Sequence, residues 1–213
     1  MSVRLLIALA GLGASVAAAA MAAPAPALFQ GAVLAQDRIL ARAVGTMQVS
    51  STQVSPDGAI PLSATGYGRS VSFPVSWTPV PDARSYALVM EELDPQKPQT
   101  TVYWLVYNIP PAVTSLGRAV HNKAESIGPA GFMQGINSSG GIGYIGPRPP
   151  TGDPAHHYHV EVFALSRLLP IKGGVKLEPL IRAMNDRVVA EGDLVVSFQP
   201  PRPGQDIPSE TTP

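Results

Sequence analysis

Residues 101–109, Thr-Val-Tyr-Trp-Leu-Val-Tyr-Asn-Ile, decide the fold of this chain. The stretch is rich in β-branched and aromatic side chains, which favour strands. Both of its alternating sets are mostly apolar: Val102, Trp104 and Val106 form one set, and Tyr103, Leu105 and Tyr107 form the other. Alternate side chains of a strand point to opposite faces of a sheet. The pattern therefore predicts a central strand that is covered on both faces.

The sequence on either side of this stretch predicts more short strands. Each is rich in Val, Tyr, Phe or Trp and is bounded by Gly, Pro, Asp or Asn. The predicted strands are Met47–Val54, Val71–Trp77, Ser85–Glu91, His157–Leu165 and Leu194–Gln199. The chain also contains 23 prolines and 20 glycines, which favour turns over long helices. We therefore expect a mainly β domain over residues 47–199.

One helix is predicted near the C-terminus, where apolar residues recur with a period of 3.6. These residues are Leu177, Leu180, Ile181, Met184 and Val188. Glu178 lies in the first turn of this helix, and Gly192 is expected to end it. Residues 200–213 are polar and rich in proline, and we expect them to form a disordered tail.

The N-terminus has the order of a secretory signal peptide. Arg4 is followed by an uncharged apolar run to Ala20, and Ala20 and Ala22 satisfy the small-x-small cleavage rule. A membrane anchor is the alternative, because the uncharged run reaches spanning length. Small residues and Pro24 follow it where an anchor would carry charges, which favours cleavage after residue 22. The mature protein is then expected to be soluble and periplasmic or secreted, with no transmembrane span.

Residues 23–46 form an N-terminal segment ahead of the predicted domain. Within 28–44 the apolar positions Leu34, Ile39, Leu40 and Val44 are consistent with a short amphipathic helix or with a tethering segment.

Composition excludes several functions. The 213 residues carry 15 basic and 15 acidic side chains, so no basic excess is present to displace counterions from nucleic acid. There is no cysteine, which excludes a disulfide scaffold, a thiol nucleophile, a zinc finger and an iron–sulfur cluster.

The Gly-rich stretch 135–158 contains the densest set of candidate functional residues. Residues 141–146 match the pattern GxGxxG, but Pro147 follows where a dinucleotide site needs a helix to begin. Ser138 and Ser139 lack the G-x-S-x-G elbow of a hydrolase. No cofactor and no catalytic residue is therefore predicted here.

Three histidines and a glutamate lie at the end of this stretch and just after it. On a strand, His157, His159 and Glu161 share one face and are expected to be solvated, because a metal site would need a further ligand. His156 and Tyr158 share the other face with Val160 and Val162. His156 could bind an anion or a polar ligand, or it could be an internally satisfied core histidine.

Three carboxylates gather at the end of the predicted strand Ser85–Glu91. They are Glu91, Glu92 and Asp94. Paired carboxylates can act as acid and base or bind a cation, but a solvated turn is the favoured interpretation. No metal site is predicted.

Three segments together resemble the phosphatidylethanolamine-binding protein family, and specifically its bacterial Raf-kinase-inhibitor-like branch. The segments are Ser85–Pro110; Gly135–Leu165, with Asn137-Ser138, Gly143-Tyr144-x-Gly146-Pro147-x-Pro149-Pro150 and His156-x-Tyr158; and, more weakly, Ala183–Val195. The resemblance covers about residues 47–199. It implies a central antiparallel sheet packed on a second, smaller sheet, with one C-terminal helix, few short helices and a small pocket for phosphate-like groups or phospholipid headgroups.

The resemblance assigns the pocket residue by residue. Pro150, His156 and Tyr158 match the family, and Arg148 stands where the loop usually has a small residue. Glu92 replaces the first pocket aspartate, Asp94 keeps the second acid, and Tyr103 replaces the pocket histidine. The sequence also departs from the family at Leu93, Tyr67 and Asp186-Arg187. Arg148 would add positive charge if it points inward.

Two functions follow as hypotheses. The first is an exported, non-enzymatic protein that binds a small anionic, phosphoryl-like ligand in a pocket with an altered lining. The second is a protein-interaction module that inhibits a kinase or protease in the cell envelope through residues 145–155, with a degenerate pocket. A hydrolase is a third reading, for which the sequence offers no complete set of catalytic residues.

Overall fold

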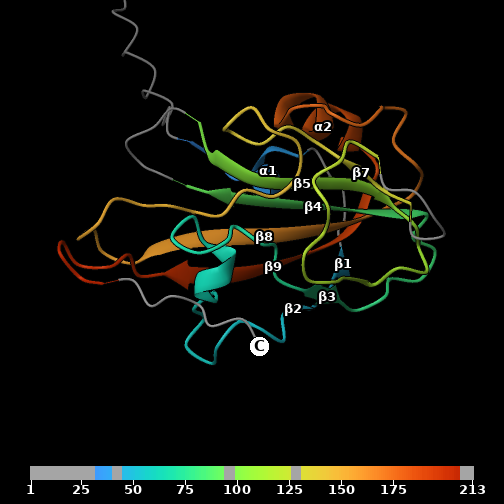
Figure 1. Cartoon of the computed structure of the whole chain (residues 1–213). Coiled ribbons are helices and arrows are strands. Elements are labelled where there is room, and N and C mark those ends of the chain that lie inside the picture. The colour runs from blue at the N-terminus through green and yellow to red at the C-terminus, as the bar shows by residue number, and fades with distance from the viewer. Residues whose placement is uncertain (1–31, 40–44, 94–98, 126–130, 207–213) are drawn as a thin grey trace, which may run out of the picture. The chain divides into compact units, whose positions relative to one another are not determined.

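The computed structural model describes residues 32–39, 45–93, 99–125 and 131–206. Its larger sheet has six strands in the order β1-β9-β8-β4-β5-β7 (Figure 1). These strands are β1 (Gly45–Thr46), β9 (Val188–Phe198), β8 (His156–Leu165), β4 (Ser85–Glu92), β5 (Thr101–Ile109) and β7 (Met133–Gln134). All neighbours are antiparallel except β1 and β9. The predicted central antiparallel sheet is confirmed.

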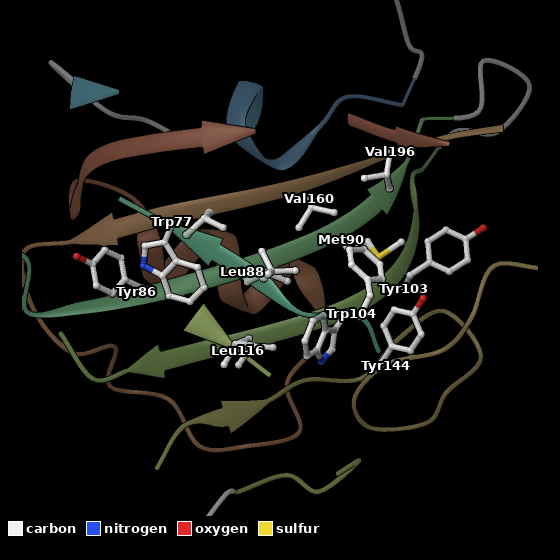
Figure 2. Packing of buried hydrophobic residues seen from close by; sticks show 14 of the residues in the cluster. Trp77, Tyr86, Leu88, Met90, Tyr103, Trp104, Leu116, Tyr144, Val160 and Val196 are labelled. Carbon is white, nitrogen blue, oxygen red and sulfur yellow. The ribbon is translucent and has the colours of Figure 1, made fainter. Parts of the chain in front are cut away.

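A second, smaller sheet packs on one face of the first. Its order is β2 (Val49–Ser50), β3 (Val75–Trp77) and β6 (Ser115–Leu116), all antiparallel. The apolar core between the two sheets runs from Trp77 and Tyr86 at one end to Tyr103, Trp104 and Tyr144 at the other (Figure 2). A short 3-10 helix, η1 (Leu62–Ala64), closes part of this side.

Helices cover the opposite face of the large sheet (Figure 1). The longer is α2 (Leu177–Met184), which buries Leu177, Leu180, Ile181 and Met184 as the period predicted. The shorter is α1 (Ala35–Arg38), where Leu34, Ala35 and Ile39 are buried. Leu40 and Val44 lie outside the described residues. No helix in the described part of the chain has the length and apolar character to cross a membrane.

The predicted end of the C-terminal helix is wrong. The helix ends at Met184, and Asp186 has a φ of 60° in the turn that follows. Val188 is the first residue of β9, and Gly192 lies in the middle of this strand opposite Val162. Val188 fits the helical spacing although it belongs to β9. It is buried in the same apolar cluster as the residues of α2.

The start of the predicted tail has defined contacts. The amide of Gly152 donates to the carbonyl of Pro201 at 3.0 Å, and that of Gln205 donates to Arg202. Residues 200–206 thus have defined positions, and disorder of the tail stays a prediction. Residues 207–213, like the predicted signal peptide 1–22, lie outside the described residues.

Candidate functional site

A β-bulge in β5 positions the candidate site. Met90 pairs with Trp104 and Glu91 pairs with Val102, so Tyr103 is an extra residue between the two pairs. A bulge of this kind changes the alternation of side chains along a strand. Tyr103 and Trp104 consequently both lie in the core between the sheets. The predicted faces of β5 are therefore wrong at this point: Val102 joins Leu105 and Tyr107 on the helix-covered face.

The bulge brings Tyr103 to the end of β4 and the start of β8. The Tyr103 hydroxyl donates to Oε2 of Glu92 at 2.7 Å. The other oxygen of this carboxylate, Oε1, contacts Nδ1 of His156 in a short hydrogen bond. Three residues from three strands thus form one continuous hydrogen-bonded chain. Glu92 has the extra methylene expected from its replacement of aspartate, and its two oxygens occupy the space between Tyr103 and His156.

Asp153 extends this chain from the loop before β8. Its Oδ2 lies 3.4 Å from Nε2 of His156, so both ring nitrogens of the histidine face carboxylates. An imidazolium donates from both of its nitrogens, and this geometry suits that form. Asp153 was not predicted from the sequence. The only signal in the sequence was that an acid stands three residues before the histidine that begins the strand. It lies in a loop, and the pattern of apolar residues does not define the path of a loop.

The aromatic residues of the site stay neutral. Burial raises the pKa of the Tyr103 hydroxyl above its ordinary value, and the hydrogen bond to Glu92 raises it further. Burial and the nearby Glu92 charge raise the pKa of Tyr158 in the same way. The two rings meet edge to face, with centroids 5.2 Å apart. The Tyr158 hydroxyl is fully buried and has no hydrogen-bond partner among the described residues.

Two of the other predicted site residues take no part in this chain of hydrogen bonds. Arg148 is exposed, donates from Nη1 to the carbonyl of Gly66 at 2.7 Å, and places its guanidinium 4.9 Å from the ring centre of Tyr67. Pro150 is exposed in the same loop. Arg148 thus holds the loop to Gly66 and Tyr67. Asp94 lies outside the described residues.

Buried polar contacts hold the Gly-rich loop, and it does not have the form of a nucleotide-binding loop. Asn137 donates from Nδ2 to Gly143 O at 2.9 Å, and the Tyr144 hydroxyl donates to Ala64 O at 2.6 Å. Gly146 is essential at its position, because a Cβ there would lie 2.6 Å from the carbonyl oxygen of Ala64. The residues of the GxGxxG match are followed by irregular chain, as Pro147 predicted.

The carboxylates expected to be solvated are buried. Glu91, Glu92 and Glu161 are 0%, 8% and 0% exposed. Glu91 points to the face opposite Glu92, where it joins Glu161 under α1. His159 lies on that face too, with Nδ1 2.6 Å from Oδ2 of Asp193. The predicted division of β8 into two faces is therefore confirmed. His157 is exposed as predicted, but His159 is half-buried and Glu161 is buried, so the predicted solvation is wrong for these two. No cluster in the described residues has the arrangement of a metal site.

Several cavities lie outside the His156 cluster in the described part of the chain, including one beside β6 and one beside α2. One, of about 400 Å³, is lined by residues 117–121, Lys123, Glu125 and Phe132. The other, of about 270 Å³, lies at the N-terminus of α2 between Arg38, Thr100, Ser138 and Lys176.

Comparison with known proteins agrees with this architecture. Residues 50–199 match the family described as phosphatidylethanolamine-binding protein. A UPF0098 protein of Methanothermobacter thermautotrophicus is 36% identical over 151 residues, which are 70% of this chain and 96% of that protein. LppC of Mycobacterium tuberculosis, which is named as a lipoprotein, is 28% identical over 159 residues, or 75% of each chain.

Solved structures give the same result. A phosphatidylethanolamine-binding protein homolog from Chlamydia trachomatis superposes with a TM-score of 0.63 at 29% identity, over 73% of this chain and 98% of that one. YbcL of Escherichia coli also gives 0.63, at 25% identity, over 73% of this chain and 99% of its own. The two-sheet fold, the family match over 50–199 and these relatives lead to one conclusion: the chain belongs to the phosphatidylethanolamine-binding protein family.

Proposed function

We propose that this chain is a non-enzymatic binding protein that takes a small phosphoryl-bearing ligand, of the phospholipid-headgroup type, at the His156 cluster. The observation that carries the proposal is the Tyr158 hydroxyl, a buried donor that has no acceptor among the residues described. It lies two residues from His156 on the same face of β8. Buried polar groups are normally paired, so this hydroxyl supports a ligand that brings an acceptor oxygen.

The charges of the cluster favour a zwitterionic ligand over a simple anion. Glu92 and Asp153 supply two carboxylates against one histidine, and Arg148 is committed to Gly66 and Tyr67. A phosphoryl oxygen suits the donors of Tyr158 and His156, whereas an ammonium group suits the carboxylates. Phosphoethanolamine carries both groups on one short chain and is the probe of choice.

Replacing His156 by alanine is expected to weaken phosphoethanolamine binding at least about tenfold, because one charge-assisted contact is lost. An NMR titration at low salt measures this through the amides of 143–152 and of Tyr158. His157→Ala is the matched control, since His157 is the next residue on β8 and is exposed on the opposite face. Inorganic phosphate and ethanolamine, tested alone, are each expected to bind more weakly.

The proposal fails if phosphoethanolamine at millimolar concentration gives no saturable shift, or if His156→Ala and His157→Ala bind equally well. In either case the pocket is degenerate, and a protein partner for residues 145–155 becomes the better hypothesis.

We also propose that the protein is exported with cleavage after residue 22. The order of charge, apolar run and small residues in 1–22 supports export, and the naming of LppC as a lipoprotein is compatible with it. Mass spectrometry of the protein from the periplasm and the medium tests this. An N-terminus at Ala23 supports export with cleavage, whereas intact Met1 in the membrane fraction supports an anchor.

A further inference from the structure

The segment Leu34–Ile39 lies across the face of the large sheet that is opposite the His156 cluster. We call this segment the strap. It contains α1, and Ala35 and Ile39 are buried in the core that α2 shares with β4, β5 and β8. Leu34 is buried as well. The family match begins only at residue 50, so the strap lies ahead of the matched region.

Two buried glutamates hold the strap by its backbone. The amide of Ala35 donates to Oε1 of Glu91 at 2.5 Å, and the amide of Gln36 donates to Oε1 of Glu161 at 2.9 Å. Adjacent amides of one chain are at most about 4 Å apart, so the two carboxylates that accept from them are close together. Strand pairing agrees, because Glu91 lies opposite His159 and Glu161 lies opposite Val89, which makes the glutamates diagonal neighbours on one face.

The hydrogen bonds under the strap do not balance if every acid is ionised. Glu161 Oε2 and Asp193 Oδ1 are buried oxygens that lack a donor in the described part of the chain, and the two residues are paired directly across β8 and β9. Glu91 accepts its other hydrogen bond from the neutral Thr100 hydroxyl. Two fully buried anions beside each other, with only neutral donors, are strongly disfavoured. A proton on Glu161 turns one orphan acceptor into a donor and removes one charge.

We propose that Glu161 is protonated in the folded protein at neutral pH, that this proton allows the strap to dock, and that loss of the proton releases the strap from the sheet. Release hydrates both carboxylates and removes Arg38 from the wall of the 270 Å³ cavity, which Thr100 also lines. The strap is thus a pH-sensitive cover for this face of the domain.

The titration behaviour of the face agrees with the geometry. Burial and the adjacent Glu91 charge raise the pKa of Glu161 to about 10 from an ordinary value of 4.5. Burial and Asp37 also raise the pKa of Glu191. An acid whose pKa is raised by folding keeps its proton while the unfolded chain loses it, so its burial destabilises increasingly as the pH rises from 4.5 to 10. The groups that face the strap are Asp37, Arg38, Glu91, Tyr107, His159, Glu161, Glu178, Glu191 and Asp193.

A spin label on the strap tests the proposal in the full chain. The chain has no cysteine, so Val33→Cys provides a single labelling site at a residue that is 41% exposed. With an alkaline titration, we expect the label to become about threefold more mobile, with a midpoint near the pKa of about 10 of Glu161. In the Glu161→Gln background the transition should vanish, because glutamine keeps the carbonyl acceptor for Gln36 and cannot ionise.

Two controls separate the strap from the rest of the protein. A label at Leu168→Cys, in the loop after β8, reports loss of the fold. Its mobility should stay constant over the pH range in which the strap label becomes mobile. In the infrared spectrum, the band of a protonated carboxyl group should be present at pH 7, disappear in Glu161→Gln and persist in Glu191→Gln. Absence of this band, an unchanged transition in Glu161→Gln, or simultaneous release of both labels would each overturn the proposal.

Discussion

Replacement of Gln134 by leucine is expected to lower the free energy of unfolding by about 3 kcal/mol, although leucine fills nearly the same volume. The Gln134 side chain is buried in β7 and makes three hydrogen bonds. Its Oε1 accepts from Nε1 of Trp104 at 2.8 Å. Its Nε2 donates to the carbonyls of His121 and Lys123 at 2.7 and 2.9 Å. Leucine leaves the Trp104 indole N–H and the Lys123 carbonyl without these bonds, whereas the His121 carbonyl still accepts from the amide of Lys123. The indole N–H has no route to water because Trp104 is 0% exposed.

The same side chain fixes a loop that the sheet does not hold. Residues 121–123 run past the end of β6, and their other anchor is Asn122, which exchanges two hydrogen bonds with the backbone of Tyr144. Loss of Gln134 therefore loosens the wall of the 400 Å³ cavity, which His121 and Lys123 line. We expect the amide signals of 119–124 to broaden in this variant, while those of β8 and β9 stay sharp.

Denaturant unfolding followed by tryptophan fluorescence measures the loss. Gln199→Leu is the matched control, because Gln199 also donates from Nε2 to two carbonyls, those of Asp153 and Pro200, but is exposed. Water replaces these contacts, and the expected loss is below about 0.5 kcal/mol. Equal effects of the two substitutions would show that burial of the Gln134 network contributes nothing.

Much of the fold could be predicted from the sequence, because the side chains of a strand alternate with a period that the sequence shows. The range Thr101–Ile109 was predicted as it is found, and Ser85–Glu91 and His157–Leu165 each fell one residue short. The two-residue strands β6 and β7 were missed, since two residues cannot display an alternation. The bulge at Tyr103 was also missed. It depends on how β5 pairs with β4, and the sequence of one strand does not show its pairing register.

Part of the candidate site could be predicted as residues, but their contacts could not. Resemblance to the family led to Glu92, Tyr103 and His156, and the structure brings these three together. It could not lead to Asp153 or to the contacts of Arg148 with Gly66 and Tyr67, because both depend on the course of loops. The burial of Glu91 and Glu161 was also out of reach, since the strap that covers them lies more than fifty residues away in the sequence.

The error at Gly192 has a physical origin that makes it informative. Glycine commonly ends helices because it adopts a positive φ without cost, and this gave Gly192 its predicted role. In the structure Gly192 lies within β9, at a place where another segment of backbone approaches closely. A Cβ on Gly192 would lie 2.3 Å from the carbonyl oxygen of Met47 and 2.8 Å from Cγ of the same residue. The glycine is required for space and not for its conformation.

Gly192→Ala is therefore expected to destabilise the protein by about 3 kcal/mol, a large effect for the addition of one methyl group. The nearest atom belongs to the backbone, so no side-chain rotation relieves the contact. Met47 must move, and with it the bond from its amide to Glu191 O at 2.9 Å and the pairing of β1 with Ala190 and Glu191. Thermal unfolding measures the loss, and hydrogen exchange should show it concentrated at the amide of Met47.

Gly117→Ala separates this steric effect from the general cost of replacing glycine. A Cβ on Gly117 would have no other atom within 4 Å, and the residue has no positive φ, so its replacement should leave stability unchanged or slightly raised. If Gly192→Ala unfolds at the same temperature as Gly117→Ala, the close approach of Met47 to β9 is wrong. Since β1 is the strand that pairs with β9 at this edge of the sheet, a loss that extends from Met47 and β1 into β9 would also show that the N-terminal pairing stabilises the edge formed by β9.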